Sequence, residues 1–137
     1  MKEINIILEE KVEYIVVHCS DTNDTDTAID IHKLHLSFGW DGIGYHKIIN
    51  RSGKIEQGRP EYWKGAHAKG FNDKSLGICL IGKSNFTTKQ FNSLKKILLF
   101  WKKKYPDVEI IGHRDTNLTK KTCPNFDVKL WCKKNLS

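Results

Sequence analysis

The run Tyr-Ile-Val-Val-His-Cys at residues 14–19 is the segment that most restricts how this chain can fold. It is rich in β-branched residues and hardly alternates between apolar and polar side chains, which is typical of a strand buried on both faces. Such a strand requires a sheet that other elements cover on both sides. We therefore predict an α/β or α+β domain, with a mixed central sheet flanked by helices.

The clearest helix is expected over residues 87–105. Thr87 and Gln90 have the spacing of a capping box, and Pro106 prevents the helix from continuing. The residues that recur on its apolar face are Phe91, Leu94, Ile97, Leu98 and Trp101. The lysines near its end suit the negative end of the helix dipole.

Two further helices complete a set of about three. One begins near Thr27, which forms a capping box with Asp30, and continues to Phe38. Its predicted apolar face consists of Ile31, Leu34 and Phe38. The other covers roughly residues 126–134.

Four segments besides residues 13–19 are expected to form strands, which gives a sheet of about five. Residues 44–50 and 54–57 predict a hairpin that turns around Ser52-Gly53. Residues 76–81 and 108–111 are short apolar runs of the same kind.

The length of 137 residues fits one domain, residues 1–137. The apolar run at 4–8 is too short for a secretory signal, and no run is long enough to span a membrane. We therefore expect synthesis in the cytoplasm without membrane insertion. The four cysteines, Cys19, Cys79, Cys123 and Cys132, are then expected to be reduced thiols or metal ligands rather than disulfides.

Positive charge is concentrated in the second half of the chain. Residues 1–70 carry nine basic and eleven acidic side chains, whereas residues 71–137 carry fourteen and five. Most of these lysines are expected on solvated helix faces, although the excess would favour an anionic partner such as a cell-wall polymer. We expect no nucleic-acid partner, because no recognised binding motif accompanies the charge.

Chemically capable side chains follow the predicted strands at the edge where ligand sites usually form. His18 ends the first strand, His113 follows the last, and Cys123 lies in the loop after it. Two histidines and one cysteine suit Zn²⁺ with its fourth position left open for water. Spacing alone leaves a plainer interpretation open, in which Cys123 is an ordinary thiol and His18 a satisfied polar residue.

Six motifs in order make the resemblance to a family specific. They are V-V-H-C-S-D-T, G-Y-H-K-I-I-N-R-S-G-K-I, G-A-H-A-K-G-F-N, S-L-G-I-C-L-I-G, G-H-R-D and K-T-C-P-N-F-D. Over residues 14–131 the chain resembles the zinc-dependent N-acetylmuramoyl-L-alanine amidases. It is most similar to the compact phage lysozyme branch, which also resembles peptidoglycan recognition proteins.

The resemblance implies one Zn²⁺ per chain, with His18, His113 and Cys123 as ligands. Some relatives carry Asp at the position of Cys123. Tyr45 and Lys121 match the two groups that assist catalysis. A lysine ammonium beside the metal would stabilise a developing oxyanion, and a tyrosine would donate a hydrogen bond or hold water.

Four other histidines and one asparagine also have expected roles. His67 and Asn72 are expected to line the substrate groove, with a loop-stabilising role as the alternative. His46 is expected to point to the sheet face opposite Tyr45, because strand side chains alternate, and to be structural or to support a site residue. His32 and His35, three apart on a helix, are not expected to bind metal.

Supporting roles are expected for the residues next to the ligands. Arg114 and Asp115 are expected to support the loop of His113, since metal-bound histidines need outer partners. Cys19 is expected to be a buried filler turned away from the metal, and Asp21 a loop residue.

The implied function is peptidoglycan hydrolysis at the amide between N-acetylmuramic acid and L-alanine, as in a phage endolysin that lyses the cell wall. Such a protein would be a monomer whose release depends on a membrane pore-forming protein. The alternatives are a non-catalytic muropeptide recognition module and a Cys-His hydrolase. The presence of Cys123, Tyr45 and Lys121 together favours the zinc enzyme.

Overall fold

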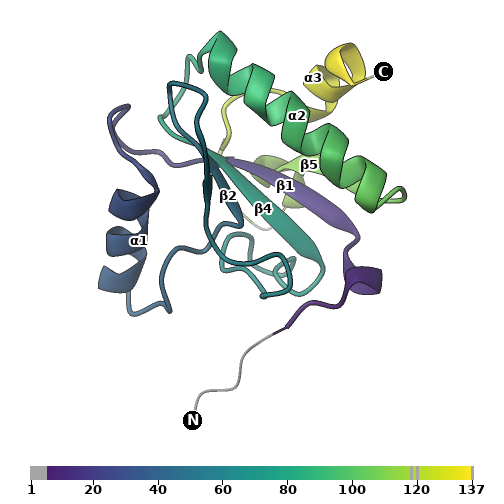
Figure 1. The fold of residues 1–137 in the computed structure, drawn as a ribbon, viewed down its shortest axis with the longest axis horizontal. Helices are drawn as coiled ribbons and strands as arrows, with labels where there is room; N and C mark the ends of the chain where they lie inside the picture. The colour runs from purple at the N-terminus through teal and green to yellow at the C-terminus, as the bar shows by residue number, and fades with distance from the viewer. Residues whose placement is uncertain (1–5, 118, 120, 137) are drawn as a thin grey trace.

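A five-stranded mixed sheet forms the centre of the molecule, as the sequence predicted (Figure 1). The computed structural model describes residues 6–117, 119 and 121–136. The strands are β1 (Tyr14–Cys19), β2 (Lys47–Ile49), β3 (Ile55–Gln57), β4 (Ser75–Leu80) and β5 (Glu109–Gly112), in the order β3-β2-β4-β1-β5. Strands β2, β4, β1 and β5 are parallel, and β3 pairs antiparallel with β2.

The central strand β1 is buried on both faces, which confirms the interpretation of its sequence. Ile15 and Val17 face the main apolar core, whereas Val16 belongs to a smaller cluster on the opposite face. His18 pairs with Cys79 of β4 in the parallel register. Because side chains alternate along a strand, His18 points to the same face as Val16, away from the main core.

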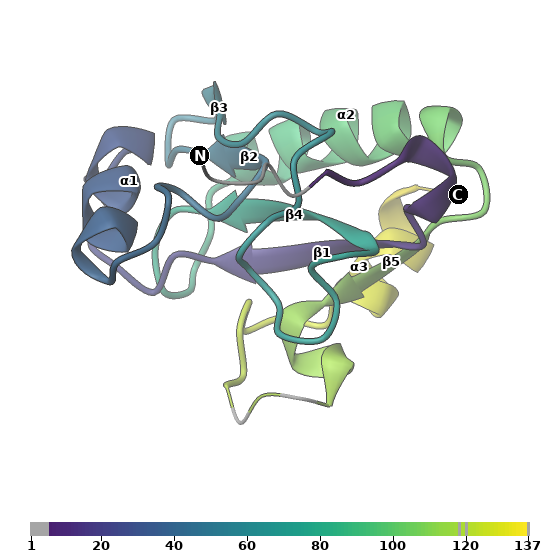
Figure 2. The ribbon, with the colours of Figure 1, turned by 90° about the horizontal axis from the view of Figure 1, so that it is seen from below.

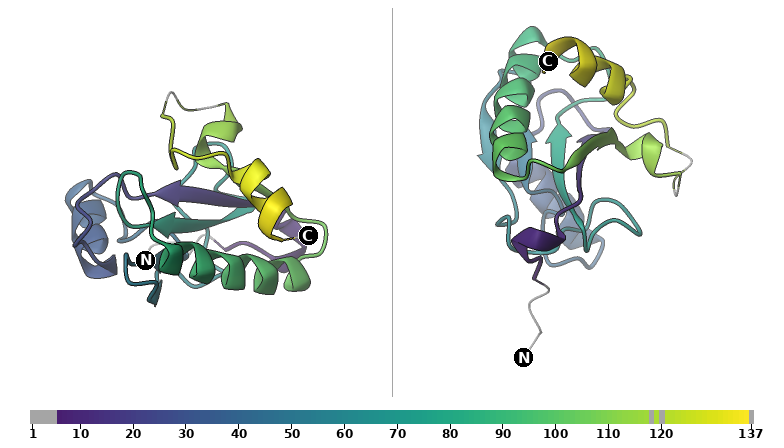
Figure 3. Two further views of the ribbon diagram at one scale, coloured as in Figure 1. Left: turned by 90° about the horizontal axis from the view of Figure 1, so that it is seen from above. Right: turned by 90° about the vertical axis from the view of Figure 1, so that its right-hand side faces the viewer.

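The helices are α1 (Ala28–Ser37), α2 (Thr88–Lys104) and α3 (Val128–Asn135). A short 3₁₀ turn, η1 (Glu9–Lys11), precedes β1, and another, η2 (His113–Thr116), follows β5. Helices α2 and α3 cover the main core, and η2 lies on the other side of the sheet (Figure 2). The carboxyl ends of β1 and β4 point toward α1 (Figure 3, left). The face with His18 is thus bordered by α1 and η2.

Helix α2 follows its predicted pattern closely. Gln90 donates its own backbone N–H to the Thr87 hydroxyl, and its side-chain oxygen accepts from the Thr87 N–H. The buried Gln90 amide also donates to the carbonyls of Ile49 and Ile81. These bonds attach the start of α2 to the ends of β2 and β4. The predicted stripe residues Leu94, Ile97, Leu98 and Trp101 are buried.

Helix α1 differs from its predicted pattern. The Asp30 carboxylate accepts from the Thr27 N–H at 2.8 Å, which confirms that cap. Ile31 is buried as expected, but Leu34 and Phe38 are 38% and 56% exposed. Leu34 and Phe38 line an open cavity, so only part of the predicted apolar face packs into a core.

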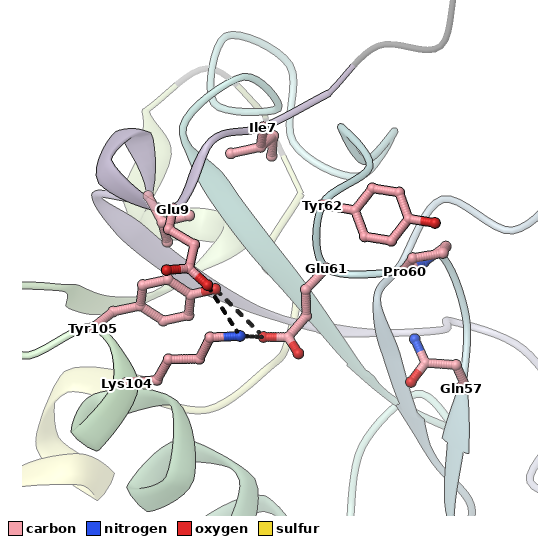
Figure 4. A pocket seen from close by; sticks show the side chains of 9 residues that line it. Ile7, Glu9, Gln57, Pro60, Glu61, Tyr62, Lys104 and Tyr105 are labelled. Carbon is pink, nitrogen blue, oxygen red and sulfur yellow. Dashed lines mark hydrogen bonds and ion pairs between the residues drawn. The ribbon is translucent and has the colours of Figure 1, made fainter.

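A small charged cluster joins the N-terminal turn η1 to the end of α2 and to Glu61 (Figure 4). Lys104 Nζ lies 3.6 Å from a carboxylate oxygen of both Glu9 and Glu61. Ile7 donates its backbone N–H to Tyr62. A cavity of about 400 Å³ beside this cluster contains no histidine or cysteine among its lining residues, so it offers no soft metal ligands.

The lysines, the cysteines and the helices were also the subject of predictions. The lysines of α2 are exposed, as predicted for a solvated helix face. All four cysteines are free thiols. Within the described residues, no helix has the length and apolar character needed to cross a bilayer.

Candidate functional site

A cavity of about 580 Å³ opens at the carboxyl end of β1. Its lining comes from five separate places in the chain: the end of β1 and the loop after it, α1 and the residues that follow it, Tyr45, residues 66–67, and the segment from His113 to Asn125. Because these segments are far apart in the sequence, only the folded chain brings their side chains together.

Three of these residues form a group with the composition of a metal site. The ligand atoms of His18, His113 and Cys123 all lie within 4.8 Å of one another. Among the described residues, no other group of three or more His, Cys, Asp or Glu meets this condition. His18 is on β1, and His113 directly follows the neighbouring strand β5, so the parallel pairing of these strands sets their rings 4.5 Å apart.

Hydrogen bonds connect the segment that carries His113 to the one that carries Cys123. Others stabilise the turn at His113 itself. Arg114 donates its backbone N–H to the Cys123 carbonyl at 2.9 Å. The Asp115 carboxylate accepts from the Gly112 N–H, and Thr116 donates to the His113 carbonyl. Asp115 therefore supports the His113 turn as predicted, and Arg114 does so through its backbone.

His18 is oriented by a chain of hydrogen bonds whose direction can be deduced. The Ser75 hydroxyl donates to the Phe71 carbonyl at 2.6 Å, so Ser75 accepts from His67 Nε2, 3.3 Å away. A neutral His67 that donates from Nε2 accepts at Nδ1, which lies 2.9 Å from His18 Nε2. The His18 proton is then on Nε2, and its Nδ1 lone pair remains available to a metal.

The electrostatics of the site favour this neutral arrangement. Burial lowers the pKa of His18 and of His67 well below 6.5, and nearby imidazoles add to the effect. Burial, together with the Lys121 charge, also lowers the pKa of His113. Neutral imidazoles are the form that binds metals.

Cys19 contributes to the site in a way that the sequence did not indicate. It is buried and is not part of the ligand group, as expected, but it is not turned away, because it lines the cavity and its thiol contacts Cys123. However, its backbone N–H donates to the Cys123 sulfur at 2.9 Å. Contact with the Cys19 thiol and burial raise the pKa of Cys123, so without a metal this sulfur keeps its proton. A coordinating metal ion would remove that proton.

Tyr45 and Lys121 both line the cavity beside the ligand group. The Tyr45 ring lies 5.1 Å from the His18 ring. Burial raises the pKa of Tyr45 well above 10, so its hydroxyl remains a hydrogen-bond donor at neutral pH. Lys121 is exposed, and its charge is felt at both His18 and His113.

The two residues expected to bind substrate have different positions. His67 lines the cavity, but its ring is used to hold His18. Asn72 is not among the lining residues; its side-chain oxygen accepts from the backbone N–H groups of His67 and Ala68, both at 2.9 Å. These bonds correspond to the loop-stabilising alternative for Asn72.

His46 is structural, as expected, but its direction is not the one that alternation suggested. Its Nδ1 accepts from the Gly77 N–H, so its Nε2 donates to the Trp63 carbonyl at 2.7 Å. The strand β2 begins only at Lys47, so strand alternation does not apply to His46. Its ring packs 5.8 Å from that of His67, on the side of the site.

His35 is one of several residues that the sequence did not place at the cavity, together with Thr22, Trp40 and Asn125. It was considered only as a metal ligand and excluded, and it is indeed outside the metal group. In the structure it is 5% exposed and faces the cavity from α1. The available signal was a histidine on the predicted buried side of the helix, four residues after Ile31.

An open His-His-Cys group at the carboxyl edge of a mixed sheet, with a tyrosine and a lysine beside it, has the composition of a hydrolytic metal centre. Comparison with known proteins identifies the family. Residues 8–126 match the family described as N-acetylmuramoyl-L-alanine amidase, and the chain belongs to this family. The resemblance inferred from the six motifs is therefore confirmed, and the protein is a peptidoglycan-cleaving amidase.

Individual relatives agree with this assignment. The chain is 40% identical to the endolysin of Enterobacteria phage T3 over 133 residues, which cover 90% of this chain and 87% of the relative. The solved endolysin amidase LysCS from Clostridium intestinale is 30% identical with a TM-score of 0.81, covering 98% of this chain and 91% of that one. Bumblebee PGRP-SA is 29% identical with a TM-score of 0.82, covering 96% and 86%. The predicted fold class is thus confirmed.

Proposed function

We propose that this amidase uses one Zn²⁺, held by His18, His113 and Cys123, to hydrolyse the amide between N-acetylmuramic acid and L-alanine. The observation that carries the proposal is the grouping of these three ligand atoms within 4.8 Å in a cavity open to solvent. Two imidazoles and a thiolate are ligands that zinc prefers, and three protein ligands leave one coordination position for water or substrate.

The surroundings of the three ligands fit such an ion. His18 has its second nitrogen bonded to His67, which is how metal-binding histidines are usually oriented. The Cys123 sulfur accepts a backbone N–H, which stabilises negative charge on it. When bound, Zn²⁺ would lower the pKa of a water molecule to about 7 and polarise the substrate carbonyl.

Tyr45 and Lys121 are the catalytic side chains in this proposal. The Tyr45 hydroxyl stays protonated and so donates a hydrogen bond to the carbonyl oxygen or orients the attacking water. The Lys121 ammonium provides positive charge at the cavity wall, where the oxyanion develops. Removing either group should lower turnover without removing the metal.

The biological role follows from the relatives named as endolysins. We infer that residues 1–137 form one catalytic domain that acts as a monomer on bacterial peptidoglycan and causes lysis. We also infer synthesis in the cytoplasm of the host and release through a membrane pore-forming protein. The basic second half of the chain would favour contact with an anionic wall.

Two other functions are less consistent with the site. A muropeptide-binding module would not need the complete set of ligands, tyrosine and lysine. A cysteine hydrolase needs a thiol with a lowered pKa, whereas burial and the Cys19 contact raise the pKa of Cys123.

Purified protein incubated with peptidoglycan tests the reaction directly. Mass spectrometry should detect free stem peptides that begin with L-alanine. Chelator should abolish their release and added Zn²⁺ should restore it, while metal analysis should give one zinc per chain. New reducing ends without free stem peptides would indicate a glycosidase instead. Activity that survives chelation but is lost on thiol alkylation would indicate the cysteine hydrolase.

A further inference from the structure

His35 presents an N–H group to the cavity in a fixed tautomer. Its Nδ1 accepts from the Gly44 backbone N–H at 2.9 Å, so the proton of the neutral ring is on Nε2. Nε2 has no hydrogen-bond partner among the residues that the structure describes. His35 is 5% exposed yet lines the cavity, so this donor is available to a bound ligand rather than to another part of the protein.

The surroundings of His35 are aromatic. Its ring lies 4.6 Å from Trp40, 5.5 Å from Tyr45 and 6.0 Å from Phe38. Phe38 and Trp40 pack edge to face against each other at 5.3 Å, and they are 56% and 41% exposed. Large apolar side chains that stay exposed together beside a binding cavity mark a surface that a ligand covers.

Other lining residues of the cavity have different chemistry. They include the polar residues Ser20, Asp21, Thr22 and Asn125. A ligand group with both a hydrogen-bond acceptor and an apolar part would therefore prefer the α1 wall. The donor remains neutral at physiological pH, because burial lowers the pKa of His35 to about 4. A neutral donor suits an uncharged carbonyl better than a carboxylate.

We propose that His35, Phe38 and Trp40 form a subsite for the 2-acetamido group of the muramoyl sugar. The acetamido carbonyl oxygen accepts from His35 Nε2, and its methyl group packs against the two aromatic rings. This subsite deepens the proposed amidase function, on which it rests. It would place the sugar beside α1, next to the ligand group.

The test compares two substrates in two variants. The substrates are a muramoyl peptide with its 2-acetamido group and an analogue with a hydroxyl at that position. His35→Asn keeps an acceptor near Nδ1 for the Gly44 N–H but removes the donor at Nε2. His32→Asn is the matched control, because His32 Nδ1 accepts from the Ile43 N–H in the same manner but His32 is exposed and does not line the cavity.

The wild-type protein and His32→Asn should prefer the acetylated substrate by about tenfold in kcat/KM, the upper end of what one hydrogen bond contributes. His35→Asn should lose most of this preference, chiefly through a higher KM for the acetylated substrate. Phe38→Ala, a change at an exposed position, should reduce the same preference without disturbing the hydrogen bond between Gly44 and His35.

The possible failures are distinguishable. If His35→Asn and Phe38→Ala both keep the full preference while releasing peptide normally, the subsite is refuted and the amidase function stands. If the wild-type protein releases no peptide from either substrate, the proposed reaction fails, and the subsite falls with it. If only the kcat changes, equally for both substrates, His35 acts on the reacting groups rather than on the acetamido group.

Discussion

The bond between His67 and His18 gives the sharpest test of the metal site. His18 is 2% exposed, and its Nε2 is 2.9 Å from its partner, His67 Nδ1. When His18 presents Nδ1 to a metal, its Nε2–H points at His67. Without His67 as acceptor, this buried N–H would be unsatisfied, at a cost of about 1–3 kcal/mol. We therefore expect His67→Leu to weaken zinc binding by roughly 10- to 100-fold, the usual effect of losing such a partner.

Leucine is chosen because the space around His67 is narrow. A Cβ added at Gly65 or Gly77 would approach the His67 ring to 2.5 or 2.6 Å, so a larger replacement would not fit. His67→Asn is the matched control, because its side-chain oxygen takes nearly the position of Nδ1 and can still accept from His18. It should retain most of the zinc affinity.

The measurement is a competition between the protein and a chromophoric chelator for Zn²⁺ at neutral pH. Thermal unfolding of the metal-free variants should be compared as well, because a general loss of stability would lower affinity for another reason. If metal-free His67→Leu unfolds near the wild-type temperature and still binds zinc with wild-type affinity, the orienting role of His67 is refuted. A loss shared equally by His67→Asn would also contradict it.

Three other predictions concern the site and its supports. Cys19→Ser should keep zinc and activity, because the bond to Cys123 comes from the Cys19 backbone, whereas Cys123→Ser should lose both in metal analysis and peptide-release assays. Lys121→Ala should lower kcat by about 10²-fold with zinc retained, the effect of losing one oxyanion-stabilising donor; unchanged turnover would exclude it from the mechanism. Burial lowers the pKa of His46 from 6.5 to about 4, so the unfolded chain binds a proton in this range that the folded chain does not. The contribution of His46 to stability, present above pH 6.5, should thus fall by roughly 3 kcal/mol as the pH drops toward 4, and His18, His35 and His67, whose pKa values burial also lowers, should add to the loss. Urea unfolding at pH 7 and 4.5 measures the total, and a flat profile would contradict the prediction.

The secondary structure was largely predictable because its signals are local. The capping pair Thr87 and Gln90, the spacing of apolar residues behind it, and Pro106 define α2 without reference to the rest of the chain. Helix α1 was less predictable. Apolar residues on a helix face indicate contact with something other than water, but the pattern does not tell a core from a ligand cavity. Leu34 and Phe38 belong to the cavity.

The proposed metal ligands were predictable only through their motifs. The spacing of His18, His113 and Cys123 has no local regularity, since each comes from a different strand end or loop. Their partners were harder to foresee. Nothing in the sequence around His67 indicates that Ser75 and Phe71 set its tautomer, and nothing around Cys19 indicates a backbone bond to a sulfur more than a hundred residues away.

The sequence by itself determined the strands, the helices and the identity of the chemically active side chains, because these depend on residue type, local spacing and ordered motifs. The tertiary structure decided which nitrogen of His18 is free, which way His46 points, and that His35 faces the cavity. These properties depend on hydrogen bonds and packing between segments that are distant in the chain. Their directions are fixed only when the sheet aligns β1, β4 and β5 side by side.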